Sequence, residues 1–217
     1  MKIRNRRKNI IIFSALLVVL SICCIINECN KHDRLEEAQI AELRNDYPIC
    51  GLEAPGMIDL VPLSLSEVKA RAETFVYGEV IGEFDIYSTK LSTGNTALDE
   101  QRQENGIIDE YSFYEYTISV IADTEGILKK GEKITISDNA IFMDYNPKLS
   151  DGMKVVVPIM RRDNDVVNRA YYTTSGMFYV TDDEYVISVF DENTTTSKAK
   201  DLLSGVNVDV LLKKLKK

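Results

Sequence analysis

Histidine is the residue whose scarcity says most about this sequence, because His32 is the only one among 217 residues. A serine or cysteine nucleophile needs a general base close to it, and a zinc ion is usually held by several histidines and cysteines. His32 lies near the N-terminus, far along the chain from the later segments, and we interpret it as an exposed polar residue. The composition therefore argues against histidine-assisted hydrolysis and against a zinc site.

Motifs for phosphate and calcium are lacking as well. Gly126 and Gly131 have the spacing of a phosphate-binding loop, but Glu132 stands where that motif requires lysine. The chain has no Asp-x-Asp-x-Asp-Gly calcium loop, and Asp163 and Asp165 are typical of a turn. We predict no catalytic, cofactor-binding or metal-binding residue and no cofactor.

Cysteine is too sparse and too badly placed for a disulfide framework. Cys23 and Cys24 lie in an apolar run, where we interpret them as apolar filler, with reversible acylation as the alternative. Cys29 and Cys50 flank a predicted helix, which would hold their Cα atoms too far apart for a bridge. The chain must therefore rely on an apolar core.

The N-terminus combines a basic end with a long apolar run. Residues 10–26 are apolar except for Ser14 and Ser21, and the five preceding basic residues are Lys2, Arg4, Arg6, Arg7 and Lys8. As a helix the run spans about 25 Å, slightly less than the hydrocarbon core of a bilayer. We predict a cytoplasmic basic tail over 1–9 and a transmembrane helix over 10–27, with the main part of the chain outside the cell.

Two alternatives to an uncleaved anchor stay open, a lipoprotein and a cleaved signal peptide. A lipidated cysteine follows a small residue, whereas Ile22 precedes Cys23 and another cysteine precedes Cys24. A signal peptide ends at a small-x-small site, and no such pair follows the run. The single-pass cell-membrane anchor is the reading that these residues favour.

The external part is acidic. Five of the 26 basic residues precede the run, which leaves 21 basic residues against 34 acidic ones and a net charge near −13. This charge opposes binding to nucleic acid or to an anionic lipid surface. We predict no nucleic-acid partner, a membrane contact through the N-terminal helix, and a protein or envelope partner outside the cell.

After the anchor we predict a stalk helix and linker over 28–63 and one extracytoplasmic domain over 64–217. The helix, from Asn30 to Asp46, has a thin apolar stripe among charges and ends before Pro48. Glycines and prolines then mark an irregular linker.

The domain begins with helical signals and continues with strands. Ser64 and Glu67 form a capping-box pattern, which predicts a helix through about Ala72. The period then changes to two in TFVYGEVIGEFDIY, which predicts a long strand that bends at its glycines. One face would carry Val76, Gly78, Val80, Gly82, Phe84 and Ile86, and the other face Glu79, Glu83 and Asp85.

The remaining elements follow from alternation and turn residues. We predict a long loop over 88–109, then a hairpin whose strands flank a turn at Lys130 and Gly131. A strand over Met153–Met160 and a pair of short strands about the Asp182–Asp183 turn come next. A helix begins near Thr196, and a basic amphipathic helix covers Val206–Lys217, packing on the domain or, alternatively, lying on the membrane.

Four stretches resemble extracytoplasmic proteins of Gram-positive bacteria and netrin-like or metalloproteinase-inhibitor modules. They read FVYGEV, YEYTISVIADTEGILKKGEKITIS, LSDGMKVVVPIM and SGMFYVTDDEYVIS, and the resemblance covers Glu67–Val189. It implies a mainly β fold, a small five-stranded barrel of the OB type with flanking helices. The inhibitors use a free N-terminal cysteine and several disulfides, which this chain lacks, so inhibition and its residues are not carried over.

Two groups of side chains remain candidates for function. Glu79, Glu83 and Asp85 would serve an envelope hydrolase if they gathered in a concave pocket; Cα atoms two residues apart on a strand are roughly 6.6 Å apart. The second group would form either core packing or a recognition surface, and consists of Tyr111, Tyr114, Tyr116, Tyr171 and Tyr172. Our leading interpretation is a membrane-anchored extracytoplasmic binding module without catalytic activity, and the alternative is that hydrolase.

Overall fold

The computed structural model describes residues 34–50, 63–90, 94–106, 110–160, 169–172, 176–190 and 203–217. Several predictions lie outside these residues: the tail over 1–9, the span over 10–27, His32, Cys23, Cys24, Cys29, the turn at Asp163 and Asp165, and the helix near Thr196. Within the described residues, no helix is long and apolar enough to cross a membrane.

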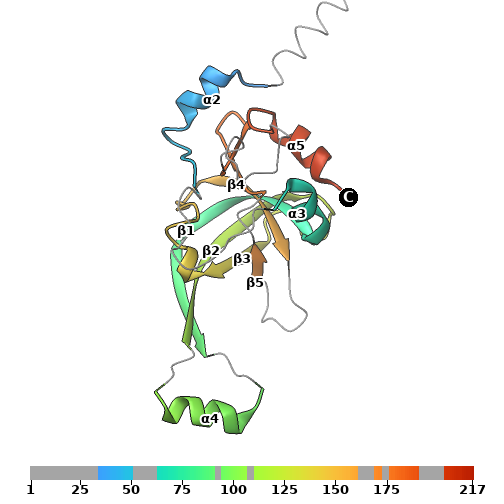
Figure 1. Cartoon of the computed structure of the whole chain (residues 1–217). Coiled ribbons are helices and arrows are strands. Elements are labelled where there is room, and N and C mark those ends of the chain that lie inside the picture. The colour runs from blue at the N-terminus through green and yellow to red at the C-terminus, as the bar shows by residue number, and fades with distance from the viewer. Residues whose placement is uncertain are drawn as a thin grey trace, which may run out of the picture.

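Strands dominate the described structure (Figure 1), and the prediction of a mainly β fold is confirmed. The strands are β1 Thr74–Lys90, β2 Glu110–Asp123, β3 Lys133–Asn139, β4 Lys154–Met160, β5 Arg169–Tyr172, β6 Phe178–Val180 and β7 Val186–Ser188. The helices are α2 Glu37–Leu43, α3 Leu65–Arg71, α4 Thr96–Glu104, the 3-10 turn η1 Ala140–Phe142 and α5 Val208–Leu215.

The strands form one sheet in the order β1-β2-β3-β5-β4-β6-β7, with an additional pairing between β1 and β4. All pairs are antiparallel except β3 with β5. The predicted hairpins are confirmed, since β2 pairs with β3 and β6 pairs with β7. Strand β5, which joins β3 to β4, was not predicted as a separate strand.

The register of strand β1 against β2 is interrupted at both glycines where a bend was predicted. Its register against β2 shifts between Tyr77 and Gly78 and again between Ile81 and Asp85, and Gly82 has a φ of 76°, which favours glycine. Position 78 requires glycine for lack of space, because a Cβ there would clash with Ile118 Cγ2. The extra residue at the first shift is Ile121 of β2, whereas at the second shift the extra residues belong to β1. Such β-bulges bend the strand that carries them and re-aim the residues beyond them.

Beyond the second register shift, the exposure of the β1 residues differs from the prediction. Val76 and Val80 are fully buried as expected, but Phe84 and Ile86 are exposed. Because β4 pairs with β1 only over Thr74–Glu79, the residues beyond the second bulge leave the body of the sheet. An inward face for Phe84 and Ile86 is therefore wrong.

The predicted loop over 88–109 is also wrong in part. Strand β1 continues to Lys90, helix α4 occupies Thr96–Glu104, and β2 starts at Glu110. Asn95 caps this helix by accepting a hydrogen bond from Leu98 N at 3.3 Å. Asparagine is a preferred N-cap residue, so a helical signal was present among the polar residues.

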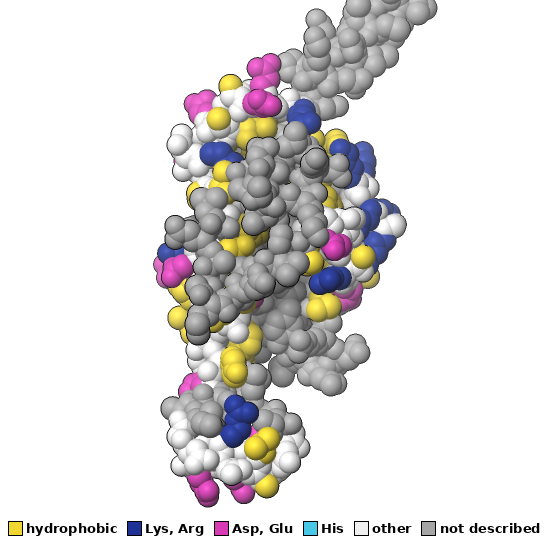
Figure 2. Space-filling view, in the orientation of Figure 1, with side chains coloured by type: hydrophobic (Ala, Val, Ile, Leu, Met, Phe, Trp, Pro, Cys, Tyr) yellow, Lys and Arg dark blue, Asp and Glu magenta, His cyan; other side chains and the backbone are white. Residues whose placement is uncertain are grey.

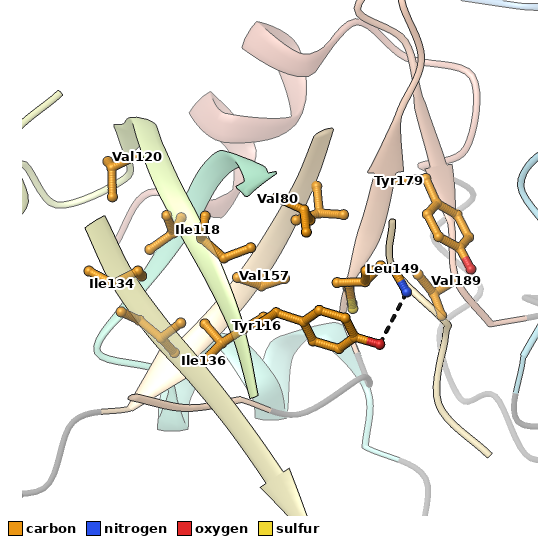
Figure 3. Packing of buried hydrophobic residues seen from close by; sticks show 14 of the residues in the cluster. Val80, Tyr116, Ile118, Val120, Ile134, Ile136, Leu149, Val157, Tyr179 and Val189 are labelled. Atoms are coloured by element: carbon orange, nitrogen blue, oxygen red, sulfur yellow. Dashed lines mark hydrogen bonds between the residues drawn. The ribbon is translucent and has the colours of Figure 1, made fainter. Parts of the chain in front are cut away.

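Two apolar clusters lie on the sheet. The first includes Val80, Ile118, Ile136, Val157 and Tyr179, all buried (Figure 3). The second lies under α3 and α5, and its members include Val68, Phe75, Val156, Leu211 and Leu215. Packing of the C-terminal helix on the domain, the first of the two alternatives, is thus confirmed, because its leucines are buried there.

Helices α3 and α5 are connected by lysine hydrogen bonds near their C-terminal ends. The predicted capping box starts α3, with Ser64 N donating to Glu67 Oε2 at 2.8 Å. Lys69 Nζ donates to the carbonyl of Lys214 at 2.9 Å, and Lys217 Nζ donates to the carbonyl of Ala72 at 2.6 Å. Cations are stabilising at helix C-termini, so two lysines stabilise this contact.

The segment 34–50 docks on the domain, and its helix is shorter than the predicted stalk helix. Leu35 N donates to Gly205 O at 2.7 Å, and Arg44 Nη1 donates to Ser188 O at 2.6 Å. Cys50 is a free thiol, and its backbone N–H bonds Val189 O at 2.9 Å. The boundary between stalk and domain at residue 64 stays a prediction.

Candidate interaction surface

The part of the molecule that stands apart from the core is a two-stranded arm ending in α4 (Figure 1). We define the arm by its described residues 84–90, 94–106 and 110–113. Figure 1 shows α4 at its far end, with α2 at the opposite end of the molecule. The arm therefore points away from the place where the N-terminal part of the chain reaches the domain.

Cross-strand pairing builds the arm. After the second bulge the register runs without a shift from Asp85 opposite Glu115 to Lys90 opposite Glu110. Ser88 and Ser112 share a hydrogen bond between their hydroxyls at 2.9 Å, and the rings of Tyr87 and Phe113 have centroids 6.1 Å apart. Such pairs stabilise a two-stranded ribbon by a few tenths to about 1 kcal/mol each.

Large hydrophobic side chains are exposed along the arm (Figure 2). Five of the eight large hydrophobic residues that are exposed in the described chain belong to it: Ile86 at 62%, Phe84 at 44%, Leu98 at 42%, Tyr111 at 41% and Tyr87 at 36%. A single exposed apolar residue is ordinary, whereas several on one element mark an interaction surface. The arm is therefore the candidate functional site.

Both faces of the ribbon contribute. Directly opposed residues share a face, so Tyr87 with Phe113 and Thr89 with Tyr111 lie on one side. Ile86, opposite the buried Tyr114, lies on the other side. Ile141, 55% exposed, belongs to η1, which follows the β3 residue Asn139 opposite Phe113. A further exposed apolar side chain thus lies two residues after the β3 residue that pairs with the base of the arm.

The arm is also acidic. The described residues of the arm include five acidic and two basic ones, a net charge of −3. Glu100 and Glu104 are exposed on α4, and Asp85 and Glu110 are exposed on the strands. The apolar surface is therefore accompanied by negative charge at the base and at the tip.

A buried polar network fixes the base of the arm. Asn146 Nδ2 donates to Tyr114 Oη and, at 2.7 Å, to Asp138 Oδ2. Asn139 N donates to Asp138 Oδ1 at 2.7 Å. Burial raises the pKa of Asp138 to about 6, although these hydrogen bonds act to lower it. Tyr114 lies opposite Ile86, so the network ties the first residues of the arm to β3 and to the turn after η1.

The candidate acids are not brought together in a buried site. Glu79 is half-buried in the body of the sheet, where it lies opposite Lys154 of β4, and Glu83 and Asp85 are exposed. In the part of the chain that the structure describes, no group of three or more His, Cys, Asp or Glu side chains is placed to hold a metal ion.

The candidate tyrosines separate into two groups. Tyr114 and Tyr116 are buried, and Tyr116 Oη accepts a hydrogen bond from Leu149 N at 3.2 Å (Figure 3). Tyr111 is exposed on the arm. Tyr171 and Tyr172 belong to β5, and their side chains lie outside the description. Core packing thus holds for two tyrosines, and the recognition surface retains Tyr111.

Sequence reasoning missed Ile86, Tyr87 and Leu98 as surface residues. Ile86 follows the alternation of Val76 and Val80, so period two alone assigns it to the core. The available signal was Gly82, since an isolated glycine inside a strand pattern indicates a bulge.

Comparison of the chain with protein-family models, with curated proteins and with solved structures finds no match.

Proposed function

We propose that this protein is a membrane-anchored extracytoplasmic interaction module without catalytic activity, and that it binds a protein partner through its arm. The domain is an OB-like β-barrel of the kind seen in netrin-like modules and in extracytoplasmic proteins of Gram-positive bacteria. The N-terminus is cytoplasmic, and a single span over 10–27 holds the domain outside the cell membrane.

The strand pairings support the OB-like assignment. From β1 they lead through β2, β3, β5 and β4 back to β1. A bent first strand that pairs with two different neighbours is a common way to coil a sheet into a small barrel. In this reading β6, β7 and the terminal helices are additions to the barrel.

The observation that carries the binding function is the exposed apolar arm. Exposing Ile86 and its neighbours opposes solubility, and several large exposed apolar side chains on one projecting element mark a contact site. The hydrolase alternative has no comparable support, because Glu83 and Asp85 are exposed to solvent and Glu79 lies in the body of the sheet.

The docked segment 34–50 supports the orientation. Leu35 bonds Gly205, so the chain reaches the domain only eight residues after the predicted span. Eight residues extend at most about 28 Å. The domain is thereby kept near the membrane, while the arm projects from the opposite end.

Copurification from detergent-solubilised envelope tests this function. The full chain is compared with the double variant Ile86→Ser, Tyr111→Ser and with a control, Ile127→Ser, Met160→Ser, whose two side chains are 43% and 47% exposed away from the arm. We expect the arm variant to lose the copurifying protein and the control to retain it. Equal retention by all three proteins would refute binding through the arm.

Topology is tested on the same cells. Protease added to intact spheroplasts should digest the domain and leave the N-terminal tail protected. Full-length protein in the soluble medium would contradict the anchor.

A further inference from the structure

We infer that the partner of the arm is a protein whose contact surface presents lysine and arginine side chains around an apolar patch. This inference rests on the proposed function and names the chemistry of the partner. Two features of the arm lead to it: the exposed apolar side chains, which need an apolar counterpart, and the surrounding acids, which need a basic one.

The apolar part of the contact is formed by aromatic and aliphatic side chains held on a rigid ribbon. Tyr87 and Phe113 pack ring against ring, and Ile86 projects from the opposite face. Their backbone is fixed by cross-strand pairing, and its base is tied to β3 through Asn146. Rigid aromatic anchors of this kind carry most of the binding energy in protein interfaces.

Acidic side chains lie on the same arm as these aromatic and aliphatic residues. Asp85 and Glu110 lie on the strands, and Glu100 and Glu104 lie one helical turn apart on α4, all four exposed. The 24 described residues of the arm include five acidic and two basic ones, so they carry −3 of the net charge of about −13 of the external part. Interactions between exposed charges are screened beyond roughly 10 Å at ordinary ionic strength. A bound partner therefore interacts with the charges of the arm more strongly than with those of the rest of the molecule.

The charge of the arm and its position in the molecule argue against two other binding partners, a second copy of this chain and an anionic membrane. A second copy would bring together two arms of net charge −3 each, and like charges across an interface oppose association. An anionic membrane surface would repel the arm, which also lies at the opposite end from α2 (Figure 1). A basic surface with an apolar centre satisfies both features of the arm.

Site-specific photo-crosslinking in the native membrane tests this inference. A photoreactive amino acid replaces Ile86 in the full-length chain, and in a control chain it replaces Ile127. Crosslinking is measured at about 50 mM and about 500 mM salt, and the crosslinked peptide is identified by mass spectrometry. Ile127 controls for exposure, because 43% of it is accessible on the turn after β2.

The matched charge variants carry three reversals each. The arm variant is Glu100→Lys, Glu104→Lys and Glu110→Lys. The control variant has the same charge change on three exposed acids at the other end of the molecule: Glu37→Lys, Glu42→Lys and Asp46→Lys.

We expect a protein crosslink from position 86 that falls at least about ten-fold in high salt and in the arm variant, stays unchanged in the control variant, and maps to a segment containing lysine or arginine. A protein crosslink insensitive to salt and to the arm reversals would overturn the basic partner while leaving the proposed function standing. A crosslink to a second copy of this chain or to lipid, or no more crosslinking than at position 127, would overturn both.

Discussion

The partly buried carboxyl of Asp138 leads to a quantitative prediction about stability and pH. Its environment at the base of the arm raises the pKa to about 6 from an ordinary value of 3.8. The cause is burial, since the Asn146 amide and the Asn139 backbone N–H both favour the charged form. The native state therefore holds a proton on Asp138 at pH values where the unfolded chain has released it.

The sign follows from proton linkage. Between pH 3.8 and about 6 the native state binds more protons at this residue than the unfolded state, so stability falls as pH rises through this window. A difference of about two pH units corresponds to roughly 3 kcal/mol. Below pH 3.8 the contribution of protonated Asp138 to the unfolding free energy is fully present, and above about pH 7 this contribution is lost.

The perturbation is Asp138→Asn, which removes the titration while keeping a side chain of similar shape. Urea unfolding of a fragment that starts at residue 34 is measured from pH 4 to pH 8 for both proteins. We expect the unfolding free energy of the original protein, relative to the variant, to decrease by about 2 to 3 kcal/mol over this range. Taking this difference removes the contributions of the other carboxyl groups.

Asp144→Asn is the matched control, because its side chain is 97% exposed and this change should alter stability by less than about 0.5 kcal/mol. A difference curve that is flat, or that rises with pH, would refute the reasoning about Asp138. Carbon-13 NMR titration of its carboxyl carbon would then show which environment the residue has.

Two further predictions concern packing. Val80 is fully buried in the first cluster, so Val80→Asp should lower the unfolding free energy by about 3 kcal/mol or more. The control Glu79→Gln should change it by less than about 1 kcal/mol. Equal urea midpoints for the two variants would show that the register of β1 is wrong. Leu211 and Leu215 belong to the buried face of α5, so Leu211→Asp with Leu215→Asp should lower the melting temperature without lipid present. The control Lys213→Gln changes an exposed side chain of the same helix and should leave the melting temperature nearly unchanged. An unchanged melting curve for the double variant would contradict this packing.

Several elements were predictable because their signals are local. The capping box of Ser64 and Glu67 starts α3, and the turn residues Lys130 and Gly131 lie between the paired strands β2 and β3. The leucine spacing of the last helix likewise identifies its buried face. In that helix a side chain's position follows from the period of the element that carries it.

Burial along β1 shows where local patterns stop being sufficient. Alternation continues without a break from Val76 to Ile86, but burial ends after the second bulge. A strand face is buried only where another layer covers it, and β4 accompanies β1 only as far as Glu79. The same alternating pattern is therefore buried in the part of β1 that pairs with β4 and exposed in the part that extends beyond β4.

The sequence by itself determined a basic N-terminus before a long apolar run, an acidic remainder of the chain, the mainly β class and the two hairpins. Tertiary structure alone decided that segment 34–50 docks through Arg44 and Cys50, that β5 joins β3 to β4, and that Ile86 and Tyr87 are exposed. The physical reason is that these features depend on contacts between residues distant in the chain, such as Arg44 with Ser188, which no local period encodes.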